Sequence, residues 1–282
     1  FRSEIEWCET AAQKLAATIE AEAWDGEYYM RAYFDDGSKL GSHESDEAKI
    51  DSLPQSWAII SGAAQPERAE MGMQAVEQHL IRENEKMILL FTPPFDKSTQ
   101  DPGYIKGYVP GVRENGGQYT HAAIWVAQAF ARKGDGTRAV QMLRMLNPVE
   151  HSRTPEDVQR YQVEPYVITA DVYALEDRVG RGGWSWYTGS SSWYYRVWIE
   201  DVLGFHKRGN RVFIEPRIPT DWPEFSIRYR FGETRYDIRI ENPSGVQLGV
   251  AWVEENGVRL ELKDGIALVD DGAEHRIIVR LG

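Results

Sequence analysis

The spacing of apolar residues changes once along this chain, near residue 204, and that change sets the fold class. Before it, apolar side chains recur every three or four residues, the period of an amphipathic helix. The segments with this spacing are residues 4–21, 52–62, 67–83, 119–133, 136–146, 161–178 and 190–203. After it, apolar and polar residues alternate in short runs, which predicts strands. We therefore expect a mainly α part, residues 1–204, followed by a β part, residues 205–282.

The β part is expected to be a small antiparallel sandwich or jelly roll, because its predicted strands are short, evenly spaced and separated by turn residues. These strands are residues 212–214, 227–231, 236–240, 248–253, 258–262 and 275–281. Within the α part, residues 24–35 have an extended pattern, and residues 92–118 are rich in proline and glycine. A loop of that length inside a compact domain usually carries function.

Charge and motif content exclude several classes of protein. The net charge is −12, whereas a groove for nucleic acid comes with a surplus of basic residues, so we expect no nucleic-acid partner. The six histidines lack zinc-ligand spacing, and the sequence has neither a nucleotide-binding phosphate loop nor a Gly-x-Ser-x-Gly nucleophile motif. We expect no metal and no cofactor. No apolar run reaches the roughly 18–20 residues of a membrane span.

Aromatic residues are abundant, with 10 Trp and 14 Tyr, and several of them cluster late in the α part. The clustered residues are Trp184, Trp186, Tyr187, Trp193, Tyr194, Tyr195 and Trp198. Trp and Tyr combine a flat apolar face with a polar group, which suits the C–H faces and polar rims of sugars. Sugar stacking and ordinary core packing both remain open for this cluster.

Residues 102–123 (PGYIKGYVPGVRENGGQYTHAA) form the first of three polar segments that could carry chemistry. Arg113, Glu114, Asn115 and His121 surround a glycine pair at the start of a predicted helix. Glycine allows close approach of the backbone to a ligand, and the first N–H groups of a helix bind anions. The alternative is a turn with a capping Asn and a core histidine.

The second segment, residues 182–196 (GGWSWYTGSSSWYYR), places Thr188, Gly189 and three serines before another predicted helix. A helix N-cap needs only one Ser or Thr, so this surplus predicts a second anion-binding element. The third segment, residues 162–173 (QVEPYVITADVY), carries Glu164 and Asp171 around a predicted helix start. Either acid could bind sugar hydroxyls or cap the helix, and we favour capping for Asp171.

Together the three segments resemble glycoside hydrolase family 94, the inverting β-glucoside phosphorylases. Within that family the chain looks most like the phosphorylase domain at the C-terminus of cyclic β-1,2-glucan synthases, where similar segments follow one another in this order. Residues 24–42 (WDGEYYMRAYFDDGSKLGS) and 52–57 (SLPQSW) add to the resemblance. It implies that residues 1–204 are the later part of an (α/α)6 barrel and that residues 205–282 are a small jelly roll.

The resemblance also implies roles for individual residues. The family binds phosphate through residues that match His121, Thr188 and Gly189. Arg113 matches a basic residue that holds the acceptor-side sugar, and we expect further substrate contacts from Glu114, Asn115, Tyr119, Glu164 and Tyr166. Inorganic phosphate would be a co-substrate, a β-glucan would be cut, and α-glucose 1-phosphate would be released.

Three departures from the family pattern matter. Cellobiose phosphorylases have Lys where this chain has Arg113, and a sugar-contacting Gln where it reads Ile168-Thr169-Ala170. Arg and Lys differ in geometry, so the first change can alter which sugar is held. Both changes point away from a β-1,4 disaccharide. The family's general acid, an Asp in a segment like Asp-Trp-Asn-Asp-Gly, is missing here, and Asp25 does not take its place. We expect that acid upstream and this piece alone to be inactive.

Two rival functions stay open. A hydrolase that uses water would need a base carboxylate, for which Glu114 and Glu164 are the candidates. A non-catalytic glucan-binding or structural fragment would need none. As partners we expect an oligosaccharide, phosphate, the rest of a longer chain and a second copy in a homodimer. The resemblance implies a location on the cytoplasmic side, attached to the inner membrane through upstream segments.

Overall fold

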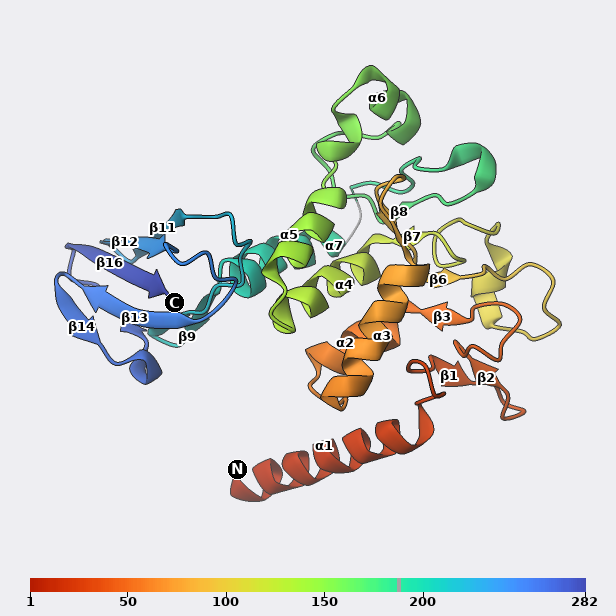
Figure 1. Cartoon of the computed structure of the whole chain (residues 1–282), viewed down its shortest axis with the longest axis horizontal. Helices are drawn as coiled ribbons and strands as arrows, with labels where there is room; N and C mark the ends of the chain where they lie inside the picture. The colour runs from red at the N-terminus through yellow and green to blue at the C-terminus, as the bar shows by residue number, and fades with distance from the viewer. Residues whose placement is uncertain (187–188) are drawn as a thin grey trace. The chain divides into compact units, whose positions relative to one another are not determined.

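The computed structural model describes residues 1–186 and 189–282 (Figure 1). The chain divides into two compact units, one made of Phe1–Ala129 with Leu143–Ser191 and the other of Phe130–Met142 with Ser192–Gly282. Helices and very short strands build the first unit, and longer strands dominate the second, which confirms the predicted order of helix and strand. Within the described residues, no helix is both long and apolar enough to cross a bilayer.

Most predicted helices of the α part are confirmed. The observed helices are α1 (Arg2–Glu22), α2 (Ser52–Ile60), α3 (Pro66–His79), α4 (Thr120–Arg132), α5 (Gly136–Met145), α6 (Pro155–Tyr161) and α7 (Ser190–Arg196), which continues as a π-helix (Val197–Val202). Local chemistry fixes the starts of two of these helices. The Asp51 carboxylate accepts a hydrogen bond from the Leu53 N–H at α2, and Pro66 begins α3, where the missing N–H costs nothing.

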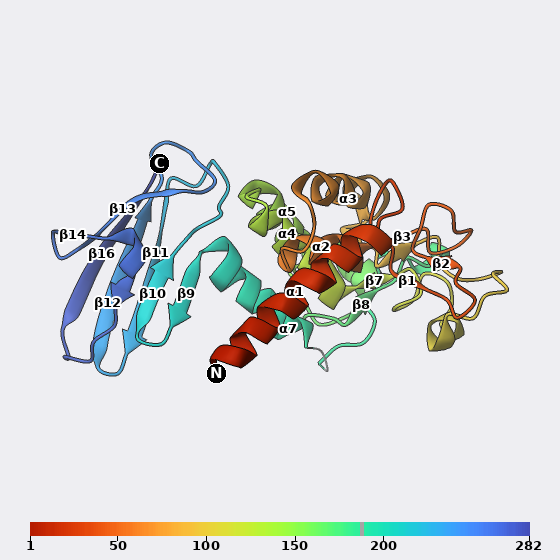
Figure 2. The ribbon, with the colours of Figure 1, turned by 90° about the horizontal axis from the view of Figure 1, so that it is seen from below.

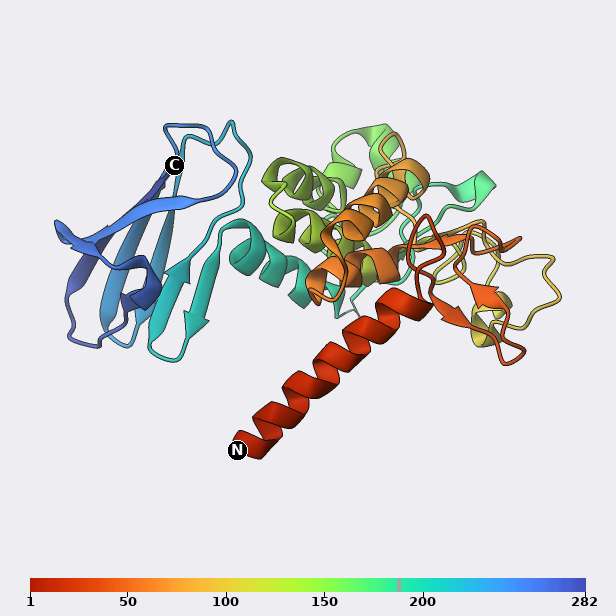
Figure 3. The ribbon, with the colours of Figure 1, turned by 60° about the horizontal axis from the view of Figure 1, so that its bottom comes forward.

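Helix α1 projects from the rest of its unit, and none of its residues is buried (Figure 3). It is attached only near its C-terminal end in the contacts described: the Arg68 guanidinium donates to the Glu20 carboxylate and to its backbone oxygen, at 2.7 Å each. The Tyr29 hydroxyl also donates to the Glu20 carboxylate. The predicted apolar stripe of this helix, including Ile5 and Leu15, is exposed.

Among the described residues of the first unit, four two-stranded pairings organise the loops. They are β1 (Ala32–Tyr33) with β2 (Lys39–Leu40), β3 (Ile50–Asp51) with β6 (Phe91–Thr92), β4 (Ile81–Arg82) with β5 (Met87–Ile88), and β7 (Gln118–Tyr119) with β8 (Asp171–Val172). The long proline- and glycine-rich segment is a loop, as predicted, with a 3₁₀ turn at Gly103–Gly107. Beneath it lies a buried cluster of Ala48, Leu90, Phe91, Phe95 and Ala122, against which Tyr119 and Trp125 pack.

The prediction of a helix over residues 161–178 is wrong. Helix α6 lies earlier and ends at Tyr161, where Gln162 adopts a left-handed backbone conformation with φ of 58°. Pro165 disfavours helical backbone at Glu164, and Asp171 and Val172 instead form β8 against β7. Both β8 residues are buried.

Two sheets build the strand-rich part of the second unit (Figure 2). One has the order β15–β10–β9, formed by Ile266–Ala267, Arg211–Ile214 and Phe205–Arg208. The other has the order β11–β12–β16–β13–β14, formed by Glu224–Phe231, Thr234–Glu241, Glu274–Leu281, Val250–Glu255 and Val258–Leu260. The predicted strands are therefore confirmed, with boundaries shifted by a few residues.

One pairing departs from the predicted antiparallel arrangement. Strands β12 and β16 pair in parallel over seven registered positions, from Arg235 opposite Glu274 to Glu241 opposite Arg280. Parallel neighbours need a long connection, and residues 242–273 supply one that carries β13, β14 and β15. Along β12, buried and more exposed side chains alternate, as expected for a strand with one face in a core.

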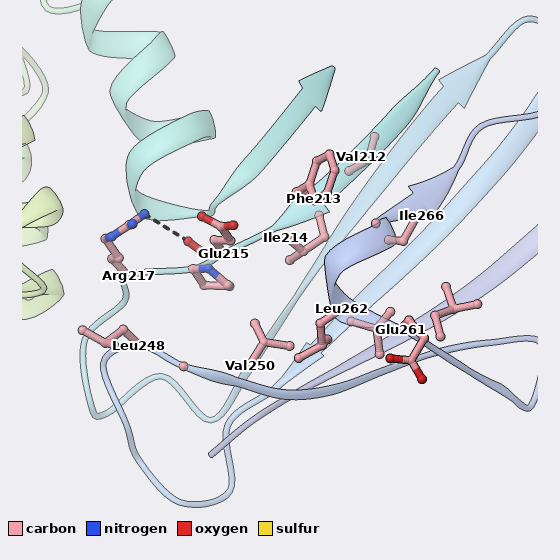
Figure 4. Close-up of a pocket in the computed structure, with 15 residues that line it drawn as sticks. Val212, Phe213, Ile214, Glu215, Arg217, Leu248, Val250, Glu261, Leu262 and Ile266 are labelled. Carbon is pink, nitrogen blue, oxygen red and sulfur yellow. Dashed lines mark hydrogen bonds between the residues drawn. The ribbon is translucent and has the colours of Figure 1, made fainter. Parts of the chain in front are cut away.

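An apolar cavity of about 300 Å³ lies inside this second unit (Figure 4). Its walls include Val212 and Ile214 from β10, Val250 from β13, Leu262 from a 3₁₀ turn (Leu262–Asp264) and Ile266 from β15. Side chains from both sheets thus face the cavity. Polar groups are few, and the Arg217 guanidinium is engaged by the Glu215 backbone oxygen at 3.3 Å.

Candidate phosphate and sugar site

A polar cavity of about 650 Å³ in the first unit collects several of the predicted site residues. Its lining residues are Arg113, Tyr119, His121, Ala170, Trp184, Trp186 and Gly189. Four of them, Arg113, Tyr119, His121 and Gly189, were singled out as ligands from the sequence. Glu114, Asn115, Glu164 and Tyr166 lie nearby in the chain but are not among the lining residues, and Thr188 lies outside the described residues.

Backbone hydrogen bonds bring the three polar segments together. Tyr119 pairs with Asp171 across β7 and β8, and the Thr120 N–H donates to the Ala170 oxygen at 2.9 Å. The Ala170 N–H in turn donates to the Trp184 oxygen at 2.7 Å. Segments that are separated by about fifty residues in sequence therefore meet at one wall of the cavity.

His121 lies in the first turn of α4, with its ring 4.5 Å from that of Trp125 one turn later. A Cβ atom placed on Gly189 would lie 3.8 Å from His121 Cε1, so the two predicted phosphate ligands are neighbours. Partial burial lowers the pKa of His121, which keeps the ring neutral near pH 7. A neutral imidazole still offers one N–H donor to an oxyanion.

Arg113 occupies a tight turn that directs its side chain to the cavity. Its φ is +51°, a conformation that costs a residue other than glycine about 1–3 kcal/mol. The turn is closed by the Gly111 N–H, which donates to the Asn115 backbone oxygen at 2.8 Å. The guanidinium lies 5.4 Å from the Tyr108 ring centre and forms an ion pair of 3.4 Å with Glu114. The strained backbone is thus held in place by its surroundings.

Asn115 is fully buried, and its amide holds the loop together. Its oxygen accepts from the Phe95 N–H at 2.7 Å, while its nitrogen donates to the Phe95 and Tyr108 backbone oxygens at 2.9 and 2.8 Å. Three such bonds contribute roughly 0.5–1.5 kcal/mol each. The observed contacts of Asn115 shape the loop around Arg113, and a direct contact with sugar stays a prediction.

The glycine pair after Asn115 has a packing explanation. A Cβ on Gly116, whose φ is +77°, would lie 2.8 Å from the Pro94 side chain. A Cβ on Gly117 would lie 2.9 Å from the Gly111 oxygen. Both distances are far shorter than real Cβ contacts, so these glycines are needed for the close approach of loop to loop. Close approach to a ligand was our expectation from the sequence.

Glu164 contacts the aromatic segment through both oxygens of its carboxylate. Oε1 accepts from the Trp186 indole N–H at 2.8 Å, and Oε2 accepts from the Ser185 hydroxyl at 3.0 Å. The hydrogen bond from Trp186 is the main reason why the pKa of Glu164 is lowered. The Tyr166 ring approaches the Trp186 ring edge-on at 6.1 Å.

Asp171 follows Ala170, which lines the cavity. No helix begins there, so the favoured capping role is wrong, and the residue is only 1% exposed beside the cavity. Its Oδ1 accepts from the Trp184 N–H at 3.1 Å. Burial raises its pKa, while the nearby positive charge of Arg113 opposes that shift. The signal available in the sequence was an acid between apolar residues in ITADVY, which fits a buried position.

Comparison with known proteins adds an independent result. A family model described as the catalytic domain of the glycosyl hydrolase 94 superfamily matches residues 2–204. The chain is 45% identical over 256 residues to the cyclic β-(1,2)-glucan synthase NdvB of Rhizobium meliloti, covering 91% of this chain and 9% of that protein.

Two phosphorylases are also similar. The solabiose phosphorylase of Paenibacillus borealis is 30% identical, covering 95% of this chain and 34% of that protein. The N,N'-diacetylchitobiose phosphorylase of Vibrio proteolyticus is 28% identical, covering 96% and 33%. The chain thus spans about a third or less of the length of these relatives. With a family model that matches most of its length, the chain belongs to the glycosyl hydrolase 94 superfamily.

Proposed function

We propose that this chain supplies the phosphate side and part of the sugar side of an active site for inverting phosphorolysis of a β-glucan. A phosphate oxygen forms a bond to the anomeric carbon while the bond from that carbon to the glycosidic oxygen breaks. The configuration inverts, so a β-glucoside yields α-glucose 1-phosphate. The leaving sugar oxygen takes a proton from a general acid.

The observation that carries this proposal is the adjacency of His121 and Gly189 at one cavity that also has Arg113 and two indoles on its walls. His121 and Gly189, together with Thr188, would donate hydrogen bonds to phosphate. Phosphate is already anionic, so donors that place it at the anomeric carbon can replace the base that a hydrolase needs. Arg113 and Tyr119 would bind the sugar.

The charge state of Glu164 favours phosphate over water as the nucleophile. A general base works best with a pKa near the working pH. Hydrogen bonds from Trp186 and Ser185 stabilise the charged form of Glu164 and lower its pKa, which makes it a weak base for activating water. The other candidate, Glu114, is paired with Arg113.

The wider setting is part of the proposal. NdvB is by its name a cyclic β-(1,2)-glucan synthase, and this similarity supports a β-1,2 linkage in the substrate. We propose that residues 1–204 belong to an (α/α)6 barrel, with the general acid on segments outside this sequence, and that residues 205–282 form a separate domain. We also propose that the protein lies on the cytoplasmic side of a membrane, to which such segments attach it, and that it forms a homodimer.

Replacing His121 in the full-length protein tests the phosphate side. The His121→Ala variant should raise the KM for phosphate and lower kcat/KM for phosphate by about 100-fold, because the loss of a donor to a reacting anion costs that order of rate. Formation of glucose 1-phosphate at varied phosphate concentration is the measurement. His79→Ala, on the exposed face of α3, is the matched control. Unchanged phosphate dependence in the His121 variant would refute the assignment.

A further inference from the structure

Two tryptophan side chains on the wall of the cavity are mostly exposed to solvent. Trp184 is 59% exposed and Trp186 is 69% exposed, although both line the cavity. Single exposed aromatics are common on protein surfaces, but a pair beside a polar cavity marks a surface for a ligand. Burial therefore contributes little to the placement of these two indoles, and other contacts must hold them.

The backbone at Trp186 is strained. Its φ is +68°, in the left-handed region that bulky side chains avoid. Such conformations persist where the surroundings fix them, and they cluster at binding sites. At Trp186 the fixing group is the Glu164 carboxylate, which accepts from the indole N–H at 2.8 Å and from the preceding Ser185 hydroxyl at 3.0 Å.

The other end of the segment is also anchored. The buried Asp171 carboxylate accepts from the Trp184 N–H at 3.1 Å, and the Trp184 oxygen accepts from Ala170 at 2.7 Å. Three residues after Trp186, Gly189 lies beside His121. A single short segment therefore has an anchored start, a strained and hydrogen-bonded middle, and an end at the phosphate side.

We propose that Glu164 is a positioning residue, which fixes Trp186 as a stacking surface for a glucosyl unit of the substrate. The hydrogen bond engages the edge of the indole and does not itself cover a face, so a face can stack on the apolar C–H face of a sugar. This role deepens the proposed function and rests on it. It replaces the direct sugar contact that we expected of Glu164, since both carboxylate oxygens already accept hydrogen bonds from the protein.

The test is a double-mutant cycle in the full-length protein, with Glu164→Ala, Trp186→Ala and the double variant. Each single variant should raise the KM for β-glucan about tenfold, while kcat and the KM for phosphate stay within about twofold of wild type. The double variant should be no worse than Trp186→Ala alone, because Glu164 acts through that ring. Glu164→Gln, whose amide oxygen can still accept from the indole, should recover part of the affinity.

Controls separate positioning from general damage. Glu156→Ala, at the exposed start of α6, should leave both KM values unchanged. The inference is overturned if Glu164→Ala leaves the KM for glucan unchanged, if it raises the KM for phosphate equally, or if the effects of Glu164→Ala and Trp186→Ala simply add.

Calorimetric titration of a β-glucan oligosaccharide without phosphate tests the same wall independently of turnover. If the wild-type protein binds the oligosaccharide but makes no sugar phosphate, the proposed function fails, while a tenfold weaker Kd in Glu164→Ala would still support the positioning role. Equal affinity in wild type and Glu164→Ala would refute it whether or not phosphorolysis occurs.

Discussion

At the scale of single residues, the histidine with the largest pKa shift among the described residues lies outside the cavity. His151 is only 6% exposed, and its ring stacks on Tyr161 at 4.7 Å. Burial, helped by the positive charge of Lys86, lowers the pKa of His151 from 6.5 to about 4. The folded protein thus resists protonation that the unfolded chain accepts.

The sign of the resulting pH dependence follows from proton binding. Between pH 6.5 and 4 the unfolded chain binds more protons at this position, so the stability that neutral His151 contributes is present above pH 6.5 and is lost as the pH falls. The shift corresponds to about 3 kcal/mol. Urea unfolding of wild type and His151→Gln at several pH values measures it: the stability gap should narrow by that amount towards pH 4. A gap that is constant with pH would contradict the burial argument.

At single positions, the sequence identified residues at the cavity more reliably than it identified the contacts that those residues make. The motifs brought forward His121 and Gly189, and the structure places them side by side. Asn115 and Glu164 also stood out, but their polar groups bind the protein's own loops. Residue type and spacing cannot distinguish a polar group that faces a ligand from one that supports the ligand's neighbours, because both need hydrogen-bond capacity at the same place.

At the scale of elements, Gly204 sits where the helical part passes into β9. Its φ is +73°, and a Cβ there would lie 2.1 Å from the Glu215 carbonyl carbon. The Glu215 N–H donates to the Gly204 backbone oxygen at 2.8 Å, so moving the two backbones apart would break this hydrogen bond. This glycine is required both by its backbone angle and by the close approach of β10's end.

Alanine at this position should therefore destabilise the second unit. We expect Gly204→Ala to cost about 3 kcal/mol or more, of which the left-handed backbone alone accounts for about 1–2 kcal/mol. Gly209→Ala is the matched control, because its φ is +61° but a Cβ there meets no atom within 4 Å. Differential scanning calorimetry of both variants should show the larger loss for Gly204. Equal losses would mean that the contact with Glu215 does not matter.

Prediction of helices and strands succeeded where a regular alternation ran over many residues. It failed where pairing between distant segments decided the structure. The eight-residue strands β11, β12 and β16 alternate clearly and were anticipated. The two-residue strands β7 and β8 carry too few residues to show a period. Their pairing joins residues 118–119 to 171–172, and no local pattern reveals such a partner. The parallel pairing of β12 with β16 was missed for the same reason.

At the scale of the whole molecule, the proposed function requires that the cavity binds phosphate as the nucleophile. Family membership and the cavity's composition agree with a phosphorylase, and the chain covers about a third or less of its relatives. The resemblance implied roles for His121, Gly189 and Arg113, and the β7–β8 pairing helps to bring their segments together.

The most direct test is product analysis of the full-length protein acting on a β-1,2-glucan with and without inorganic phosphate. We expect α-glucose 1-phosphate, identified by phosphorus NMR and its anomeric coupling, only when phosphate is present, and no comparable release of free sugar without it. Release of free glucose at the same rate in the absence of phosphate, with no sugar phosphate formed, would show that the protein is a hydrolase and not a phosphorylase.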